Sequence, residues 1–138
     1  MLRLANHTDV EGIVDGLLSL KARTGWSRYH QPGYNQQSLR EFVTRQLNSS
    51  VSVCYVWDAG GVVKAFCGGE LRRFNLPPYM PCVLEWGWYG SQREAVRCWQ
   101  KVRRWGLLRG AELAGRVHPS PATRSNRVIE QVVWEILQ

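Results

Sequence analysis

Apolar residues recur at helical spacing in two stretches of the first fifty residues. The first run has apolar side chains at i, i+3, i+4, i+7 and i+8, namely Val10, Ile13, Val14, Leu17 and Leu18. It follows the capping-box sequence 8–11 and predicts an amphipathic helix, preceded by a short strand in which Leu2 and Leu4 alternate with a polar residue. A second run opens at 38–41 and predicts a second helix. Its apolar face consists of Leu39, Phe42, Val43 and Leu47.

The apolar period changes to two after residue 50, which indicates strands. One face of the first strand is formed by Val51, Val53, Tyr55 and Trp57. The strand ends at the sequence 58–61, Asp-Ala-Gly-Gly, which is typical of a hairpin turn. The partner strand is expected at 62–71, with a bulge or bend at Gly68 and Gly69.

The stretch 82–110 reads as a short apolar strand that runs directly into a helix. The sequence Ser91-Gln92-Arg93-Glu94 has the spacing of a capping box, and Gly110 is a plausible end of the helix. The apolar stripe of this helix is formed by Ala95, Trp99, Val102 and Leu107. A strand that ends at a helix N-terminus leaves unpaired amides and the positive end of the helix dipole beside it. Such a corner can hold a phosphate group.

The C-terminal part alternates again over 111–117 and is then broken by the prolines of 118–121. We expect a closing helix over 126–137, with a strand at 132–137 as the alternative. The predicted order is therefore β-α-α-β-β-β-α-β-α. With neither internal repeats nor a linker, the chain 1–138 is predicted to form one mixed α/β domain.

Composition adds limits to this picture. The apolar content of 44% and the seven tryptophans favour a globular protein, and no apolar run approaches the length of a membrane span. Acidic residues occur too early for a signal peptide, so we expect a soluble, cytoplasmic protein without a membrane partner. None of the four cysteines forms a CxxC motif and the histidines are not at zinc-ligand spacing, so we expect buried free thiols and no metal site.

The formal net charge of +7 helps to recruit anions, although a merely solvated basic surface explains it equally well. Fifteen of the eighteen basic residues are Arg, and they are scattered rather than clustered in a block. The sequence shows neither a recognition helix nor an RNP-like pair of aromatic residues. We therefore expect no nucleic-acid partner.

The predicted order, and the residues placed along it, resemble the GNAT superfamily of acyl-CoA-dependent N-acetyltransferases. The segment 2–14 looks like the first strand and helix of that family, the hairpin around 58–61 like its second and third strands, and 82–108 like its fourth strand and coenzyme-binding helix. The resemblance implies a GNAT-like domain with a central mixed, mostly antiparallel sheet flanked by about four helices. It also implies transfer of an acetyl group from acetyl-CoA to an amine.

The coenzyme loop departs from the family signature Arg/Gln-x-x-Gly-x-Gly/Ala. Counted from Arg93, the small positions hold Val96 and Cys98; counted from Gln92, they hold Ala95 and Arg97. Neither register has the glycine that lets a backbone approach a pyrophosphate closely. A carboxylate of Glu94 at the helix N-terminus would also oppose a phosphate, whereas Arg93 and Arg97 could bind one through their side chains. The coenzyme residues implied by the resemblance are Trp88, Gln92, Arg93, Ala95, Val96, Arg97 and Asn126.

Two residues are candidates for proton transfer. Glu85 lies on the fourth strand, where family members often hold a general base, and burial beside Leu84 and Trp86 would raise its pKa. The alternative is an outward-facing carboxylate paired with Arg. His118 ends the fifth strand and could act as base or acid, or be an ordinary surface residue. The family often places a Tyr seven residues after the Asn that corresponds to Asn126. In this sequence that position is Val133.

These departures leave a second function open, a catalytically degenerate GNAT-fold protein that serves as a structural, assembly or docking module. The chain is also similar to small GNAT-like proteins encoded among the structural and assembly genes of short-tailed bacteriophages, which would place it in the host cytoplasm or the virion. The loop 26–34 carries Trp26, Tyr29 and Tyr34 and would be either a substrate flap or a contact for a protein partner.

Overall fold

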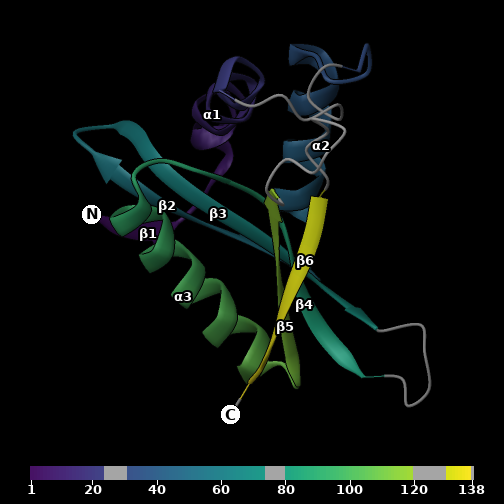
Figure 1. Ribbon diagram of the computed structural model, residues 1–138. Coiled ribbons are helices and arrows are strands. Elements are labelled where there is room, and N and C mark those ends of the chain that lie inside the picture. The colour runs from purple at the N-terminus through teal and green to yellow at the C-terminus, as the bar shows by residue number, and fades with distance from the viewer. Residues whose placement is uncertain (24–30, 74–79, 120–129, 138) are drawn as a thin grey trace.

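Six strands form one sheet in which they follow one another in chain order (Figure 1). The computed structural model describes residues 1–23, 31–73, 80–119 and 130–137. All neighbouring strands are antiparallel except β4 and β5, which are parallel. The strands are β1 (Leu2–Leu4), β2 (Ser52–Ala59), β3 (Val62–Arg73), β4 (Pro81–Tyr89), β5 (Leu113–Pro119) and β6 (Glu130–Ile136).

Helices cover both faces of this sheet. The helical elements are η1 (His7–Asp9), α1 (Val10–Arg23), α2 (Gln36–Asn48) and α3 (Gln92–Leu108). Figure 1 shows α1 and α2 on one side of the sheet and α3 on the other. The predicted mixed α/β fold with a mostly antiparallel sheet is confirmed. The described residues contain three α-helices and one 3₁₀ turn rather than about four helices, and none of these helices is long and apolar enough to cross a membrane.

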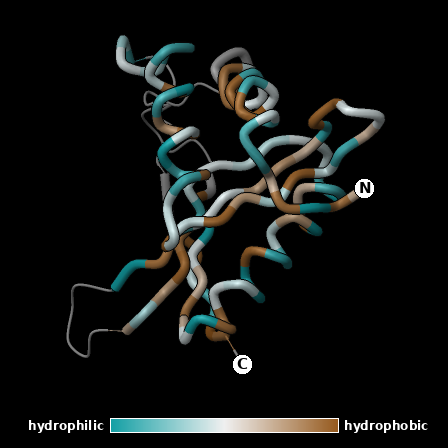
Figure 2. Tube along the Cα trace, turned by 180° about the vertical axis from the view of Figure 1, so that it is seen from behind, coloured by the Kyte–Doolittle hydropathy of each residue, from teal (hydrophilic) through white to brown (hydrophobic). Residues whose placement is uncertain are grey.

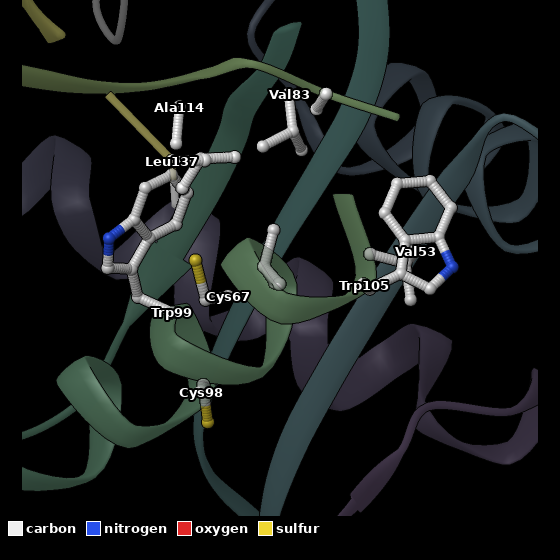
Figure 3. Close-up of a cluster of buried hydrophobic side chains, with 10 residues drawn as sticks. Val53, Cys67, Val83, Cys98, Trp99, Trp105, Ala114 and Leu137 are labelled. Atoms are coloured by element: carbon white, nitrogen blue, oxygen red, sulfur yellow. The ribbon is translucent and has the colours of Figure 1, made fainter. Parts of the chain in front are cut away.

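The sheet separates two apolar clusters, because successive side chains of a strand point to opposite faces. One cluster packs α1 and α2 against the sheet around Ile13, Val43 and Phe66, all fully buried. The other lies under α3, where Figure 3 shows Trp99 and Trp105 at opposite ends with Cys67 and Cys98 between them. Apolar and polar residues alternate along α3 in Figure 2, as a helix with one buried face requires.

The first two helices begin at residues other than those predicted. Asn6, not Thr8, caps the first turn: its side chain accepts from the Thr8 amide, and the Asp9 carboxylate accepts from the Asn6 amide. The second helix begins two residues before 38–41, because Asn35 accepts from the Ser38 amide at 2.9 Å. In both places an Asn in extended conformation, an N-cap at least as good as Ser or Thr, ends the preceding strand or loop.

Arg3 ties the first strand to two other elements. Its guanidinium donates to both oxygens of Asp9, at 2.7 and 2.9 Å, and to Asp58 at the end of β2, at 3.1 Å. Burial of Asp9 opposes its ionisation, but the hydrogen bonds from Arg3 and from the Asn6 amide hold the pKa of this carboxyl below its usual range. The short strand β1 is thereby fixed on the sheet edge by a paired, ionised carboxylate.

The predicted closing helix is wrong for residues 130–136, which form the edge strand β6. This strand pairs with β5 from Leu113↔Ile136 to Pro119↔Glu130, and the ring of Trp134 packs over Gly115. The run contains β-branched residues that suit a strand, so the alternative of a strand at 132–137 was the better interpretation. The fifth strand begins at Leu113 rather than at residue 111. Residues 126–129 lie outside the described residues.

The predicted bulge at Gly68 and Gly69 is confirmed. Gly68 pairs with Gly87 and Gly69 pairs with Glu85, so Trp86 is an extra residue in β4. The indole of Trp86 occupies the space that a side chain at Gly68 would need, because a Cβ there would lie 2.1 Å from the ring. The bulge therefore depends on a residue without a side chain opposite Trp86.

The turn from β4 into α3 depends on Gly90. Its φ is +115°, in a region that side chains rarely adopt, and an added Cβ would lie 2.4 Å from the Cβ of Ala65. Ser91 then caps α3, as predicted, by accepting from the Glu94 amide. The chain can thus leave the sheet and start the helix within two residues.

Replacement of this glycine tests the turn. Gly90→Ala should lower the free energy of unfolding by about 2 kcal/mol or more, because it combines backbone strain with a clash against β3. Gly33→Ala is the matched control: no atom lies within 4 Å of its added Cβ, and it should leave stability unchanged or slightly higher. Urea unfolding followed by circular dichroism measures both. Equal stability of the two variants would contradict this account of Gly90.

Candidate functional site

The parallel strands β4 and β5 pair over only three residues. The ladder runs from Cys82↔Leu113 to Leu84↔Gly115, while β4 continues to Tyr89 and β5 to Pro119. In Figure 1, β4 turns toward the start of α3 whereas β5 stays beside β6. The extra residue at Trp86 explains the separation, since a bulge bends and twists its strand. Residues 85–89 of β4 therefore have no partner on β5, within strands that are both fully described.

The carboxylate of Glu85 lies at the point where these strands separate. It is 3% exposed and lies on the α3 side of the sheet with Cys67. Its Oε1 accepts from the backbone amide of Val117 at 3.4 Å. Its Oε2 accepts from Arg116 Nε at 3.3 Å and from the Cys67 thiol at 3.4 Å. Glu85 is thus paired with Arg, as one prediction had it, but it faces inward instead of outward.

Burial raises the pKa of the Glu85 carboxyl, against the opposing effects of Arg116 and the hydrogen bonds. Burial also raises the pKa of the Cys67 thiol well above its ordinary value, so this thiol remains a neutral hydrogen-bond donor. The Arg116 guanidinium lies 5.4 Å from the centre of the Trp99 ring. The result is a desolvated carboxylate with one cation beside it, which is suited to accept a proton.

The N-terminus of α3 already carries a negative charge. The Glu94 carboxylate accepts from the Ser91 hydroxyl and lies 3.1 Å from Lys64 Nζ on β3, instead of accepting from the Ser91 amide as predicted. The hydrogen bonds from Ser91 and Lys64 lower the pKa of Glu94. An anion that binds at this corner would therefore meet a fixed carboxylate, whose charge Lys64 partly neutralises.

Four of the predicted coenzyme residues come together on the exposed side of α3. Gln92, Arg93, Val96 and Arg97, together with Gln100, line an open hollow of about 580 Å³. The guanidinium of Arg97 also lies 5.7 Å from the centre of the Trp57 ring. The first turns of α3 thus present two Arg side chains, rather than bare backbone, to an anion.

The other predicted site residues lie elsewhere or outside the described part. Ala95 is buried on the core side of α3, and Trp88 packs half-buried against the same apolar cluster. Asn126 lies outside the described residues. His118 belongs to β5 opposite Gln131, but its side chain lies outside the described part of the structure.

The aromatic loop is described only at its end. Tyr34 is half-buried, and its hydroxyl donates to the Leu17 carbonyl at 2.7 Å, so this side chain packs against α1 rather than offering an exposed contact. Trp26 and Tyr29 lie outside the described residues. In the described part of the chain, all four cysteines are free and buried, and no group of three or more His, Cys, Asp or Glu residues could hold a metal ion.

Two residues that complete the site were missed. Arg116 shares a face of β5 with the buried Ala114 and therefore points under α3, which the period of two could have revealed once β5 was placed beside β4. Lys64 has no local signal, because only the approach of β3 to the helix start brings it to Glu94.

Comparison with known proteins shows similarity of structure only. No family model matches the chain, and no curated protein matches it by sequence. Its structure is similar to an N-acetyltransferase from Staphylococcus aureus Mu50 (TM-score 0.71, 14% identity, 91% of this chain and 76% of that chain). It is also similar to the aminoglycoside N-acetyltransferase AAC(6')-Iy in complex with CoA (TM-score 0.67, 19% identity, 88% and 77%). A transcriptional regulator from Bacillus halodurans C-125 shares the fold as well (TM-score 0.66, 14% identity, 91% and 84%). These similarities confirm the predicted GNAT fold.

Removal of the cation beside Glu85 should be costly. Arg116→Met leaves a buried carboxylate without its partner, and we expect the free energy of unfolding at pH 7 to fall by about 3 kcal/mol. In the double variant Glu85→Gln/Arg116→Met the uncompensated charge is gone, so the loss should shrink to about 1 kcal/mol. Urea unfolding measures the cycle. A double variant as unstable as Arg116→Met would show that Arg116 stabilises by packing alone.

The raised pKa of Glu85 predicts a pH dependence with a definite sign. The folded protein binds this proton more tightly than the unfolded chain, so the stability it contributes is fully present below pH 4.5 and is lost as pH rises through the folded pKa. The stability of the wild type relative to Glu85→Gln should therefore fall as pH rises above 4.5. The carboxyls with lowered pKa, such as Asp9, cancel in this difference. Chemical unfolding of both proteins between pH 4 and 8 tests it; a difference that rises with pH would contradict it.

Proposed function

We propose that the protein is an N-acetyltransferase that transfers the acetyl group of acetyl-CoA to an amine. The observation that carries the proposal is the separation of the parallel strands β4 and β5, with the Glu85 carboxylate where they part and the start of α3 at the end of β4. The same fold in an N-acetyltransferase crystallised with CoA supports it.

The residues at the start of α3 fit a phosphate-bearing coenzyme through side chains. Arg93 and Arg97 are exposed beside the hollow and would bind the phosphates by charge-assisted hydrogen bonds. Glu94 opposes them, but its ion pair with Lys64 reduces the repulsion. The unpaired edge of β4 offers backbone groups to the extended part of the ligand. We therefore expect binding that is weaker than a glycine-rich loop would give.

Glu85 is the group that we assign to proton transfer. When bound, acetyl-CoA supplies the acetyl group as a thioester. The amine nitrogen forms the new bond to the acetyl carbon, and the bond from that carbon to sulfur breaks, so that CoA leaves with the electron pair as its thiolate. Glu85 accepts the proton that the nitrogen loses, directly or through water. Arg116 keeps the carboxylate available in its ionised form, and burial makes it a stronger base. His118, on the neighbouring strand, is the second candidate for this role.

One observation favours a second candidate, a docking module without catalysis. The helix start that would bind the coenzyme is capped by its own carboxylate, and Glu94 is held there by both Ser91 and Lys64. A chain that no longer binds the coenzyme loses nothing by this arrangement and gains a well-capped helix.

Calorimetric titration with acetyl-CoA tests the proposal directly. We expect Arg93→Ala to weaken binding and Glu94→Gln to strengthen it about two- to five-fold, because the fixed negative charge at the helix start is removed. Glu112→Gln, which removes an exposed carboxylate beyond the other end of α3, is the matched control and should have no effect.

The proton-transfer role of Glu85 is measured by comparing Glu85→Gln with the wild type. Across a panel of amines, release of CoA thiol should be about 10²-fold or more slower in Glu85→Gln than in the wild type. Absence of acetyl-CoA binding at millimolar concentration would overturn the proposal that the protein is an N-acetyltransferase and would favour the docking module. If acetyl-CoA binds and the turnover of Glu85→Gln equals that of the wild type, the protein is still an enzyme, but another residue is the general base.

A further inference from the structure

We propose, contrary to the expectation drawn from the sequence motifs, that the exposed face of α3 binds the phosphate backbone of a nucleic acid without regard to sequence. The basic stripe that carries this proposal consists of Arg93, Arg97, Lys101 and Arg104. It extends well beyond the start of α3, where the coenzyme would be bound. Arg93 and Arg97 are shared with the proposed coenzyme site, whereas Lys101 and Arg104 lie beyond it. Nucleic-acid binding therefore does not require acetyl transfer, and it is tested at Lys101 and Arg104.

The stripe follows from the helical repeat. Its members are four, four and three residues apart, so they share one face of α3 and succeed one another about every 4.5–6 Å along the axis. All four side chains are exposed. The scattered arginines of the sequence thus become a row of cations once the helix forms.

Two neighbouring open hollows lie along this face. The hollow of about 580 Å³ at the helix start shares Arg97 and Gln100 with a second one of about 500 Å³. The second is lined mainly by basic residues of α3 and also by Leu2, Leu107 and Leu137. Together they follow α3 from residue 92 to residue 107, a length of about 22 Å. A polyanion lying along the helix would therefore meet cations throughout.

The charge of the stripe is not neutralised by the described residues. Two carboxylates beside α3 form ion pairs with other residues, Glu94 with Lys64 and Glu135 with Arg103 at 2.7 Å, and Glu94 acts on Arg93 only through space. In the described ranges, the four stripe residues form no ion pair, and the contact of Arg97 with Trp57 leaves its charge intact. Condensed counterions on a nucleic acid would be released by such cations, which favours binding.

The make-up of the stripe favours nucleic acid over an acidic protein. Protein interfaces have an apolar, often aromatic centre, whereas the centre of this face presents guanidinium, ammonium and amide groups and has no aromatic lining residue among those described. Nucleic-acid interfaces are polar and strongly positive, and guanidinium groups bind phosphate oxygens in pairs. Since the sequence contains no recognition motif, the contacts are to phosphates and not to bases.

Fluorescence anisotropy with labelled 20-nucleotide DNA, single-stranded and duplex, tests the proposal between 50 and 200 mM salt. The double variant Lys101→Ala/Arg104→Ala removes two charges far from the helix start. Arg45→Ala/Arg73→Ala removes two exposed charges from α2 and β3 and is the matched control. We expect the stripe variant to bind duplex DNA about tenfold more weakly than the wild type. The slope of its log K against log salt concentration should be less steep by about 1.8, because two phosphate contacts are lost. The control should retain the wild-type slope.

Three results would overturn the proposal. The first is that neither DNA binds at 50 mM salt, and the second is that the two double variants weaken DNA binding equally. The third is that a labelled poly-glutamate peptide binds as tightly as DNA, which would identify an acidic protein as the partner. Titration of the stripe variant with acetyl-CoA distinguishes nucleic-acid binding from coenzyme binding. Its coenzyme affinity should equal that of the wild type, so either function can fail while the other stands.

Discussion

The indole of Trp86 fills the space of the missing side chain at Gly68, and β4 thereby holds one more residue than β3 at this point. Trp86 is anchored on the α2 side by a hydrogen bond from its Nε1 to Ser52 Oγ, at 3.1 Å, and by an edge contact with Phe42. Strand β4 bends at this residue and separates from β5, its Glu85 side chain lies on the α3 side of the sheet, and the strand ends beside the start of that helix. The separated strands, the buried carboxylate and the position of α3 are all consequences of this one packing arrangement.

Glu85 in turn bridges the gap that the bulge opens. Where the backbone ladder between β4 and β5 ends, the carboxylate continues the link by accepting from the Val117 amide and from Arg116. The same contacts explain why a charged group is tolerated at 3% exposure, since buried charges need a partner and satisfied hydrogen bonds. Glu85 thus links the two strands at the point where they separate, and its burial there raises the pKa of its carboxyl.

The sequence predicts the elements that depend on neighbouring residues. Helix α1, the hairpin at 58–61, the bulge and the Ser91 cap all follow from local spacing. The strand β6 could not be distinguished from a helix because its short apolar run fits either period, and pairing with β5 decides it. The raised pKa of Glu85 was expected from Leu84 and Trp86, yet adjacent strand residues point to the opposite face. Cys67 and α3 bury it instead, and its partner Arg116 is 31 residues away.

The carboxylate of Glu94 has a consequence for the choice of ligand. Because this carboxylate is part of the chain, it competes with any anion for the start of α3 at every protein concentration. We expect a small free anion such as inorganic phosphate to make too few contacts at this corner to displace the Glu94 carboxylate. A larger ligand that also contacts Arg93 and Arg97 recovers the loss through several simultaneous contacts. We therefore expect this corner to bind extended, multiply charged ligands more tightly than simple ions.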